Sequence, residues 1–231
     1  MSTKREQARS QRKRRIFDAA RAIIVRGGLE SLTPRALAQA ADLTVPTLYN
    51  LVGGKDEILT QMLSQDVEAI WERLDFDRRA DPLDMADAII AEAYEVVRVD
   101  KALHRACLPL MIELKVVFAA NPSRDDPGAR AANRCVEMAQ FACEAAIKSG
   151  ELRGSVPAYE LGQQMFISYR GPMRDWLEDV ISADEMIRRQ KRGFYLALAA
   201  DASDDFRKIL IHRIAGLAGD YPTTTTVKDA A

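Results

Sequence analysis

The sequence of 231 residues lacks the long apolar runs that mark membrane proteins. No stretch approaches the roughly 20 consecutive apolar residues of a membrane-spanning helix. The basic amino terminus is not followed by the apolar core of a signal peptide. We therefore expect a cytoplasmic protein that makes no contact with a membrane.

Cysteine is scarce and unpaired. Cys107, Cys135 and Cys143 have neither the spacing of a metal site nor that of a redox motif. On a shared helix, Cys135 and Cys143 would lie about 12 Å apart along the axis, which is too far for a disulfide. We expect all three to be buried free thiols rather than a redox switch.

The sequence also lacks the patterns of common catalytic sites. His104 and His212 are the only histidines, and neither falls in a metal-ligand spacing or beside a Gly-x-Ser-x-Gly turn. There is no glycine-rich phosphate loop, and the glycine pairs at 27–28 and 53–54 are interpreted as helix ends. No nucleophile or general base is indicated, so we predict no enzyme activity, no cofactor and no metal.

The alternation of β-branched and polar residues that indicates a sheet is missing as well. Apolar residues recur at three- and four-residue steps instead, which predicts an all-α fold. We expect a first ordered helix from Ile16 to the glycines at 27–28, and a long helix from Lys55 to about Leu74. Further helices are predicted over 83–98, 101–119, 128–149, 157–180, 183–200 and 204–217.

The net charge of −1 conceals an uneven distribution. Residues 1–60 contain 11 Lys and Arg against 6 Asp and Glu, a balance of +5, whereas residues 61–231 contain 22 against 28, a balance of −6. Arg21 and Arg26 are expected to be solvated. We predict a flexible basic arm over 1–15 that lies along DNA phosphates or reaches into a minor groove. Its basic residues are Lys4, Arg5, Arg9, Arg12, Lys13, Arg14 and Arg15.

The segment from Thr33 to Lys55 predicts two short helices joined by a tight turn. Thr33 and Thr44 can each cap a helix, and the prolines that follow them fall in the first helical turn, where they are tolerated. Asp42 and Leu43 would form the turn. This arrangement matches a helix-turn-helix, whose second helix enters the major groove of DNA.

Lys55 is predicted to open the next helix, where the macrodipole makes a cation unfavourable. A phosphate docked at that terminus would turn the penalty into an advantage, because free amides and the ammonium group would face the same anion. The alternative interpretation is an ordinary solvated lysine. We favour the phosphate contact because of the place of Lys55 after the helix-turn-helix.

The segment from Ala41 to Leu59, with Lys55 in register, resembles the DNA-binding signature of the TetR family of transcriptional regulators. The resemblance covers about the first 60 residues. It departs from the family at Asp42, where glycine is frequent, and at Pro46, where a small or basic residue is frequent. It departs again at Leu51-Val52-Gly53, where histidine, phenylalanine and proline are common.

The resemblance implies a ligand-responsive repressor that binds a near-palindromic double-stranded operator as a homodimer and is released by a small, largely hydrophobic effector. It divides the chain into a helix-turn-helix domain over 16–60, a ligand-binding and dimerisation domain over 61–219 and a disordered tail over 220–231. Thr33, Tyr49 and Lys55 would hold phosphates. The expected DNA-binding residues are Thr33, Arg35, Thr44, Val45, Pro46, Thr47, Tyr49, Asn50 and Lys55.

Members of the resembled family enclose a small-molecule pocket in the second domain and pair through their last long helices. The helices predicted over 157–180 and 183–200 are apolar on more than one side, as pairing would require. Met and aromatic residues with a few polar groups would suit a largely hydrophobic effector. The expected pocket residues are Tyr94, His104, Leu108, Met111, Phe141, Gln164, Met165 and Tyr169.

Three other classes of protein remain open. The chain could be an architectural DNA-binding protein without an effector, which the absence of a pocket would indicate. It could be a regulator that senses a protein partner, which a binding assay with that partner would reveal. It could also be an all-helical enzyme with a basic head, which turnover of a substrate would reveal.

Overall fold

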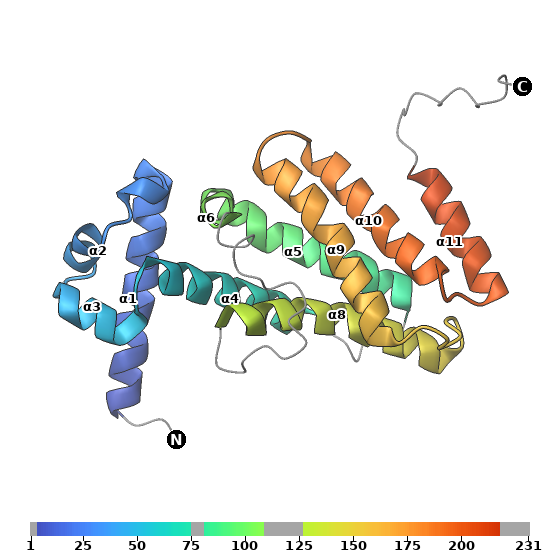
Figure 1. Ribbon diagram of the computed structural model, residues 1–231, viewed down its shortest axis with the longest axis horizontal. Helices are drawn as coiled ribbons and strands as arrows, with labels where there is room; N and C mark the ends of the chain where they lie inside the picture. The colour runs from blue at the N-terminus through green and yellow to red at the C-terminus, as the bar shows by residue number, and fades with distance from the viewer. Residues whose placement is uncertain (1–3, 75–80, 109–126, 218–231) are drawn as a thin grey trace, which may run out of the picture.

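The structure, a computed structural model, describes residues 4–74, 81–108 and 127–217. Within these residues the regular structure is helical, apart from one isolated antiparallel bridge between Leu152 and Ala202. The prediction of an all-α fold is therefore confirmed. Figure 1 shows a small group of helices at the amino-terminal end, from which one long helix runs into a larger bundle.

The small amino-terminal group, which we call the head, packs around one apolar core. It contains α1 (Lys4–Gly27), a short 3-10 turn (Leu29–Ser31), α2 (Pro34–Ala40) and α3 (Val45–Val52). The start of α4 (Lys55–Arg73) closes the core from the side of the bundle. The head core includes Ile16, Phe17, Ala20, Ile24, Leu37, Leu48 and Val52, at the helical spacings expected from the sequence.

The starts of α2 and α3 follow the prediction. The Thr33 hydroxyl accepts a hydrogen bond from the N–H of Ala36 at 3.2 Å, and the Thr44 hydroxyl accepts one from the N–H of Thr47 at 3.4 Å. Between the two helices Asp42 has a φ of 56°, in the left-handed region. Glycine adopts this region without steric cost, so a glycine at this position would also fit the turn.

The basic residues near the amino terminus belong to α1, so the prediction of a flexible arm is wrong for residues 4–15. Residues 1–3 lie outside the described residues. Arginine, lysine, glutamine and alanine favour the helix, and no glycine or proline separates this segment from the buried face that begins at Ile16. With 24 residues, α1 is about 36 Å long. Its first turns extend beyond α3 in Figure 1.

The long helix predicted from Lys55 is confirmed as α4, which has 19 residues and is about 28 Å long. Ile58, Leu59 and Met62 in its first half belong to the head core. Ile70 in its second half belongs to a separate core inside the bundle. One continuous helix is therefore fixed in both cores.

The bundle, which we call the body, follows the other predicted helices closely. It contains α5 (Pro82–Val99), α6 (Lys101–Ala106), α8 (Pro127–Ser149), α9 (Ala158–Leu177), α10 (Ala183–Ala199) and α11 (Asp204–Gly216). In Figure 1, α9 lies between α8 and α10 and packs against both. The predicted tail over 220–231 lies outside the described residues.

The helix predicted over 101–119 is interrupted, because α6 ends at Ala106 and Cys107 forms a turn before Leu108, which is again helical. Proline at position 109 has no N–H to donate to the carbonyl of residue 105, which favours a break in the helix at this point. Residues 109–119 lie outside the described residues.

A buried aspartate joins the two loops at the far end of the body. Asp201, between α10 and α11, is only 2% exposed. Its carboxylate accepts hydrogen bonds from the backbone N–H groups of Gly154 at 2.7 Å, Ser155 at 3.0 Å and Val156 at 3.3 Å. These residues belong to the loop between α8 and α9, so Asp201 fixes that loop against the end of α10.

Replacing Asp201 with alanine should destabilise the body strongly, because three N–H groups would lose an ionised acceptor. We expect Asp201→Ala to lower the free energy of unfolding by about 3 kcal/mol or more. The matched control is Asp204→Ala, which removes an exposed carboxylate paired with Arg153. That change should cost less than about 1 kcal/mol. Urea unfolding followed by circular dichroism measures both, and equal effects would contradict the role of Asp201.

Candidate DNA-binding surface and ligand pocket

The outer side of α3 is available to a partner. Leu48 and Val52 face the head core, whereas Pro46, Tyr49 and Asn50 are exposed, and Tyr49 is 49% exposed. An exposed helix that carries aromatic, amide and hydroxyl groups can enter the major groove and meet base edges.

The other predicted base-reading residues differ in their exposure. Arg35 on α2 and Thr44 at the start of α3 are exposed, and Thr47 is half-buried with its hydroxyl 2.8 Å from that of Thr44. Val45 is also half-buried and packs against the head core, because the start of α3 lies against α2. Val45 therefore offers less surface to DNA than the sequence led us to expect.

The three predicted phosphate contacts lie together although they come from different parts of the chain. Thr33, Tyr49 and Lys55 line one small hollow of about 10 Å³, together with Gly53 and Gly54. Gly53 has a φ of 84°, which directs the chain sharply from α3 into α4. The hollow is therefore lined by three residues that carry a hydroxyl, a phenol and an ammonium group.

Lys55 is half-buried rather than freely solvated. Its ammonium group donates a hydrogen bond to the backbone carbonyl of Leu29 at 2.8 Å. A phosphate oxygen is a stronger acceptor than a neutral carbonyl, because charge-assisted hydrogen bonds are roughly twice as strong as neutral ones. Because Lys55 lines the hollow, a phosphate docked there could replace the Leu29 carbonyl as the acceptor of this hydrogen bond.

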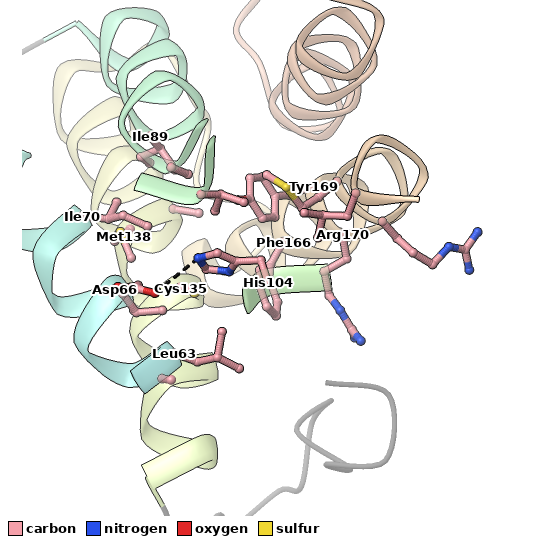
Figure 2. A pocket seen from close by; sticks show the side chains of 18 of the residues that line it. Leu63, Asp66, Ile70, Ile89, His104, Cys135, Met138, Phe166, Tyr169 and Arg170 are labelled. Atoms are coloured by element: carbon pink, nitrogen blue, oxygen red, sulfur yellow. Dashed lines mark ion pairs between the residues drawn. The ribbon is translucent and has the colours of Figure 1, made fainter. Parts of the chain in front are cut away.

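A second site lies inside the body. A pocket of about 340 Å³ is enclosed by α4, α5, α6, α8, α9 and α10 (Figure 2). This volume lies at the lower end of the range of small-molecule sites. Most of the lining is apolar, and includes Leu63, Val67, Ile70, Ile89, Ala93, Val97, Leu108, Met138, Phe166 and Phe194.

Three of the predicted pocket residues line this pocket: His104, Leu108 and Tyr169. Burial raises the pKa of the Tyr169 hydroxyl, so this group stays protonated and can donate a hydrogen bond to a ligand. Met111 lies outside the described residues.

Four other predicted pocket residues lie elsewhere. Met165 is fully buried in the body core, and Gln164 is exposed on the outer side of α9. Tyr94 and Phe141 pack against tryptophan rings, with centroid distances of 5.5 and 5.6 Å. The sequence identified these helices as apolar, but the side of each helix that faces the pocket is decided by packing against its neighbours.

The sequence analysis missed Asp66, which lines the pocket from α4. Leu63, Val67 and Ile70 lie on the same side of that helix, at steps of three and four residues. The sequence could have indicated Asp66, because it places a carboxylate within an apolar stripe and a charged group is rarely buried without a partner. Arg170 and Arg174 of α9 were missed too, and Figure 2 shows Arg170 on the side of the pocket away from Asp66.

Asp66 joins the pocket to the head. One carboxylate oxygen lies 3.2 Å from Nε2 of His104, and the other accepts a hydrogen bond from Arg21 of α1 at 3.1 Å. Arg21 also donates to Asp100, which stands between α5 and α6, at 3.0 Å. The expectation that Arg21 is solvated is therefore wrong, because its guanidinium spans two carboxylates of the body.

The wall of the pocket formed by α9 contains a proline. Pro172 lies inside the helix and has no N–H to donate, which interrupts the regular helical hydrogen bonding. Near this point the side chain of Gln190, fully buried on α10, donates a hydrogen bond to the carbonyl of Tyr169 at 3.1 Å. This bond fixes the backbone that carries Tyr169 against α10.

The three cysteines are free thiols. Burial raises the pKa of Cys107, Cys135 and Cys143 to about 12, so each thiol is protonated at neutral pH and is a poor nucleophile. Cys135 lines the pocket, where its thiol adds to the apolar surface.

Within the described ranges, no group of three His, Cys, Asp or Glu side chains could hold a metal ion. No helix over residues 4–74, 81–108 and 127–217 is long and apolar enough to cross a membrane.

The head and the body together define an all-α protein with a helix-turn-helix domain and an internal pocket. Residues 16–62 match the family model for the bacterial regulatory proteins of the tetR family. The resemblance of the segment from Ala41 to Leu59 to this family is therefore confirmed for the amino-terminal part of the chain.

Part of the chain is also similar to a curated relative. The HTH-type transcriptional repressor KstR of Rhodococcus jostii is 31% identical over 99 residues, which are 43% of this chain and 47% of that protein. The chain thus spans about half the length of this curated relative.

Two solved structures share the fold over most of the chain. FadR from Bacillus subtilis, in complex with stearoyl-CoA, has a TM-score of 0.60 at 16% identity and covers 80% of this chain and 97% of its own. Thermus thermophilus FadR, in complex with lauroyl-CoA, has a TM-score of 0.61 at 20% identity and covers 81% of this chain and 93% of its own.

Replacing both Tyr49 and Lys55 with alanine should weaken binding to all DNA sequences, because the two side chains line the hollow in which a phosphate would sit. We expect about a 10-fold loss or more, together with a shallower dependence of affinity on salt. Fluorescence anisotropy at several salt concentrations measures this. Tyr49→Phe, which keeps the ring and removes the hydroxyl, separates hydrogen bonding from packing. Full affinity in the double variant would remove both residues from the DNA-binding surface.

Proposed function

We propose that the protein is a ligand-responsive transcriptional repressor that binds a near-palindromic operator as a homodimer and is released by a largely hydrophobic effector. The observation that carries this proposal is the sharing of α4 between the head and the pocket. Ile58, Leu59 and Met62 belong to the head core, while Leu63 and Asp66 line the pocket. A ligand that moves α4 therefore also moves the helix-turn-helix.

In this proposal the helix-turn-helix domain spans residues 16–60 and makes the DNA contacts. Thr33, Tyr49 and Lys55 bind phosphate at the hollow, and α3 reads bases with Pro46, Thr47 and Asn50. Val45 contributes apolar contact through the part of its surface that is not packed. Arg35 and Thr44 reach the backbone beside the groove, and the basic turns of α1 add affinity that salt weakens.

The ligand-binding and dimerisation domain spans residues 61–219 in this proposal and acts as a sensor rather than an enzyme. The pocket offers an apolar interior, with Arg170 and Arg174 on the α9 side and Asp66 with His104 on the α4 and α6 side. An apolar molecule with an anionic end suits this distribution, because the arginines can pair with the anion while the chain is buried. The ligands of the two FadR structures, stearoyl-CoA and lauroyl-CoA, have this character and supply probes.

Two copies would pair through the outer sides of α9 and α10. Ile167 on α9 is 46% exposed and Leu196 on α10 is 53% exposed, and these helices pack side by side. A surface that contains exposed aliphatic residues on two adjacent helices fits a self-complementary twofold interface. Pairing would place two copies of α3 on one side of the operator, about one helical turn apart or more.

An effector of the proposed class should release the operator. The operator is first obtained by selecting bound sequences from a random DNA pool with the purified protein. Lauroyl-CoA or stearoyl-CoA should then lower operator affinity by about 10-fold or more, within the usual range of allosteric coupling. Coenzyme A without the acyl chain is the matched control and should have no effect. Unchanged DNA binding in the presence of either bound acyl-CoA would contradict the regulatory proposal.

Ile167→Glu should dissociate the dimer, because it would bury an unpaired charge in the proposed interface. The matched control is Ile209→Glu on α11, since Ile209 is exposed to a similar degree, 50%. Sedimentation velocity measures the shift from dimer to monomer, and operator affinity should fall with it. Dissociation by the Ile209 variant but not by the Ile167 variant would place the interface on α11 instead.

A further inference from the structure

The pocket has one polar end, formed by Asp66 of α4 and His104 of α6. The carboxylate oxygen Oδ2 of Asp66 lies 3.2 Å from Nε2 of His104, as the dashed line in Figure 2 shows. The side chain of His104 is only 8% exposed and that of Asp66 only 14%. Both residues line the pocket, whose remaining surface on this side is apolar.

These two buried atoms are not satisfied by the protein. Among the described residues, neither Asp66 Oδ2 nor His104 Nε2 has a hydrogen-bond partner of good geometry, although the two atoms lie close together. Buried polar atoms in native proteins are nearly always hydrogen-bonded, because an unmade bond leaves the loss of hydration without compensation. A pocket that presents such atoms is built to receive a hydrogen-bonding group from a ligand.

The same carboxylate is bound from the opposite side by the head. Arg21 of α1 donates to Asp66 Oδ1 at 3.1 Å and to Asp100 Oδ2 at 3.0 Å. One guanidinium therefore joins α1 to α4 and to the start of α6. Arg21 does not line the pocket, so it can respond to a ligand only through Asp66 and Asp100.

The packing of α6 reinforces this connection. Leu103 and Cys107 belong to the head core, whereas His104 and Leu108 line the pocket. A rotation of His104 toward a ligand would act on a helix whose adjacent side is packed against the head. The head is thus held to the polar end of the pocket by one ion-pair cluster and by one shared helix.

We propose that Asp66 and His104 form the ligand-sensing end of the pocket, and that Arg21 transmits the state of this pair to the DNA-binding head. The proposal rests on the proposed function, because it requires that the pocket receive an effector. It adds that the buried end of the effector carries an oxygen, as a hydroxyl or a carbonyl group. His104 donates a hydrogen bond to this oxygen when the imidazole turns away from Asp66.

The consequence is a change in the partners of Asp66. Without a ligand the carboxylate faces His104 and Arg21 together. With the ligand bound, His104 leaves and the carboxylate is held by Arg21, so the position of α1 relative to α4 and α6 changes. The ligand and the operator then favour different arrangements of the same cluster, which is the condition for coupling between two sites.

The sensing step is tested with lauric acid and ω-hydroxylauric acid, which differ by one terminal hydroxyl. The wild-type protein should bind the hydroxylated acid at least about 5-fold more tightly, because the pair supplies hydrogen bonds that the methyl end cannot use. His104→Phe should remove this preference, so that the two acids bind within about 2-fold of each other. Isothermal titration calorimetry measures the four affinities. A preference retained in His104→Phe would overturn the sensing role.

The transmission step is tested by the ratio of operator affinities without and with ω-hydroxylauric acid. Arg21→Gln should leave the binding of this acid within about 2-fold of wild type, yet reduce the ratio from about 10-fold or more to less than about 3-fold. Arg21→Lys, which keeps the cation but can reach one carboxylate at a time, should give an intermediate ratio. The matched control is Arg26→Gln on the same helix. Arg26 is exposed, and within the described part of the chain it donates a hydrogen bond only to the carbonyl of Ala22.

The outcomes separate the two proposals. A wild-type ratio in Arg21→Gln would overturn the transmission role, and so would an equal loss in Arg26→Gln. Failure of both acids to bind the wild-type pocket would overturn the sensing end. Failure of the wild-type protein to bind any DNA from the selected pool would instead overturn the proposed function. Circular dichroism of each variant confirms that it is folded before these comparisons.

Discussion

The arrangement of this protein depends on the burial of one helix in two cores. Ile58, Leu59 and Met62 hold the first half of α4 in the head, and Ile70 holds its second half in the body. Burial of three large apolar side chains contributes about 5–9 kcal/mol relative to their exposure. That energy is many times the thermal energy, so the head follows α4 rather than turning independently. The pocket lies against the same helix, so a ligand that displaced this helix would act on the head through packing that the fold already requires.

Charge adds a second connection at the boundary between head and body. The head carries the excess of basic residues and the body the excess of acidic residues, and Arg21 meets Asp66 and Asp100 where the two parts touch. Exposed pairs such as Lys208 with Asp205 contribute little to stability, because water and salt screen them. The carboxylates bound by Arg21 are mostly buried, so their interaction with the guanidinium is screened less. The burial of an ion pair therefore affects its contribution to stability more than the distance between its charged atoms does.

The features that sequence analysis predicted correctly depend on local chemistry. The caps at Thr33 and Thr44, the helix ends at glycine and the start of α4 at Lys55 follow from residues within one turn of each other. The pocket lining was predicted only in part. Met165 and Phe166 are adjacent apolar residues, and only the packing of α9 against its neighbours decides that Phe166 faces the pocket while Met165 lies in the core. The partners of Arg21 are 45 and 79 residues away, so no local pattern could reveal them. Pro109, by contrast, was a local signal that could have indicated a break in the helix predicted over 101–119.

The helical state of the basic segment in α1 limits how it can meet a nucleic acid. A flexible arm could bring all of its cations to one strand, but it would lose conformational entropy as it became ordered. In α1 successive residues are rotated by about 100°, so the seven cations between Lys4 and Arg15 point in several directions. Only a subset can face one duplex, and the number of counterions that this segment displaces is correspondingly smaller than its charge. The others remain in solvent and add a long-range positive potential that attracts the duplex before contact.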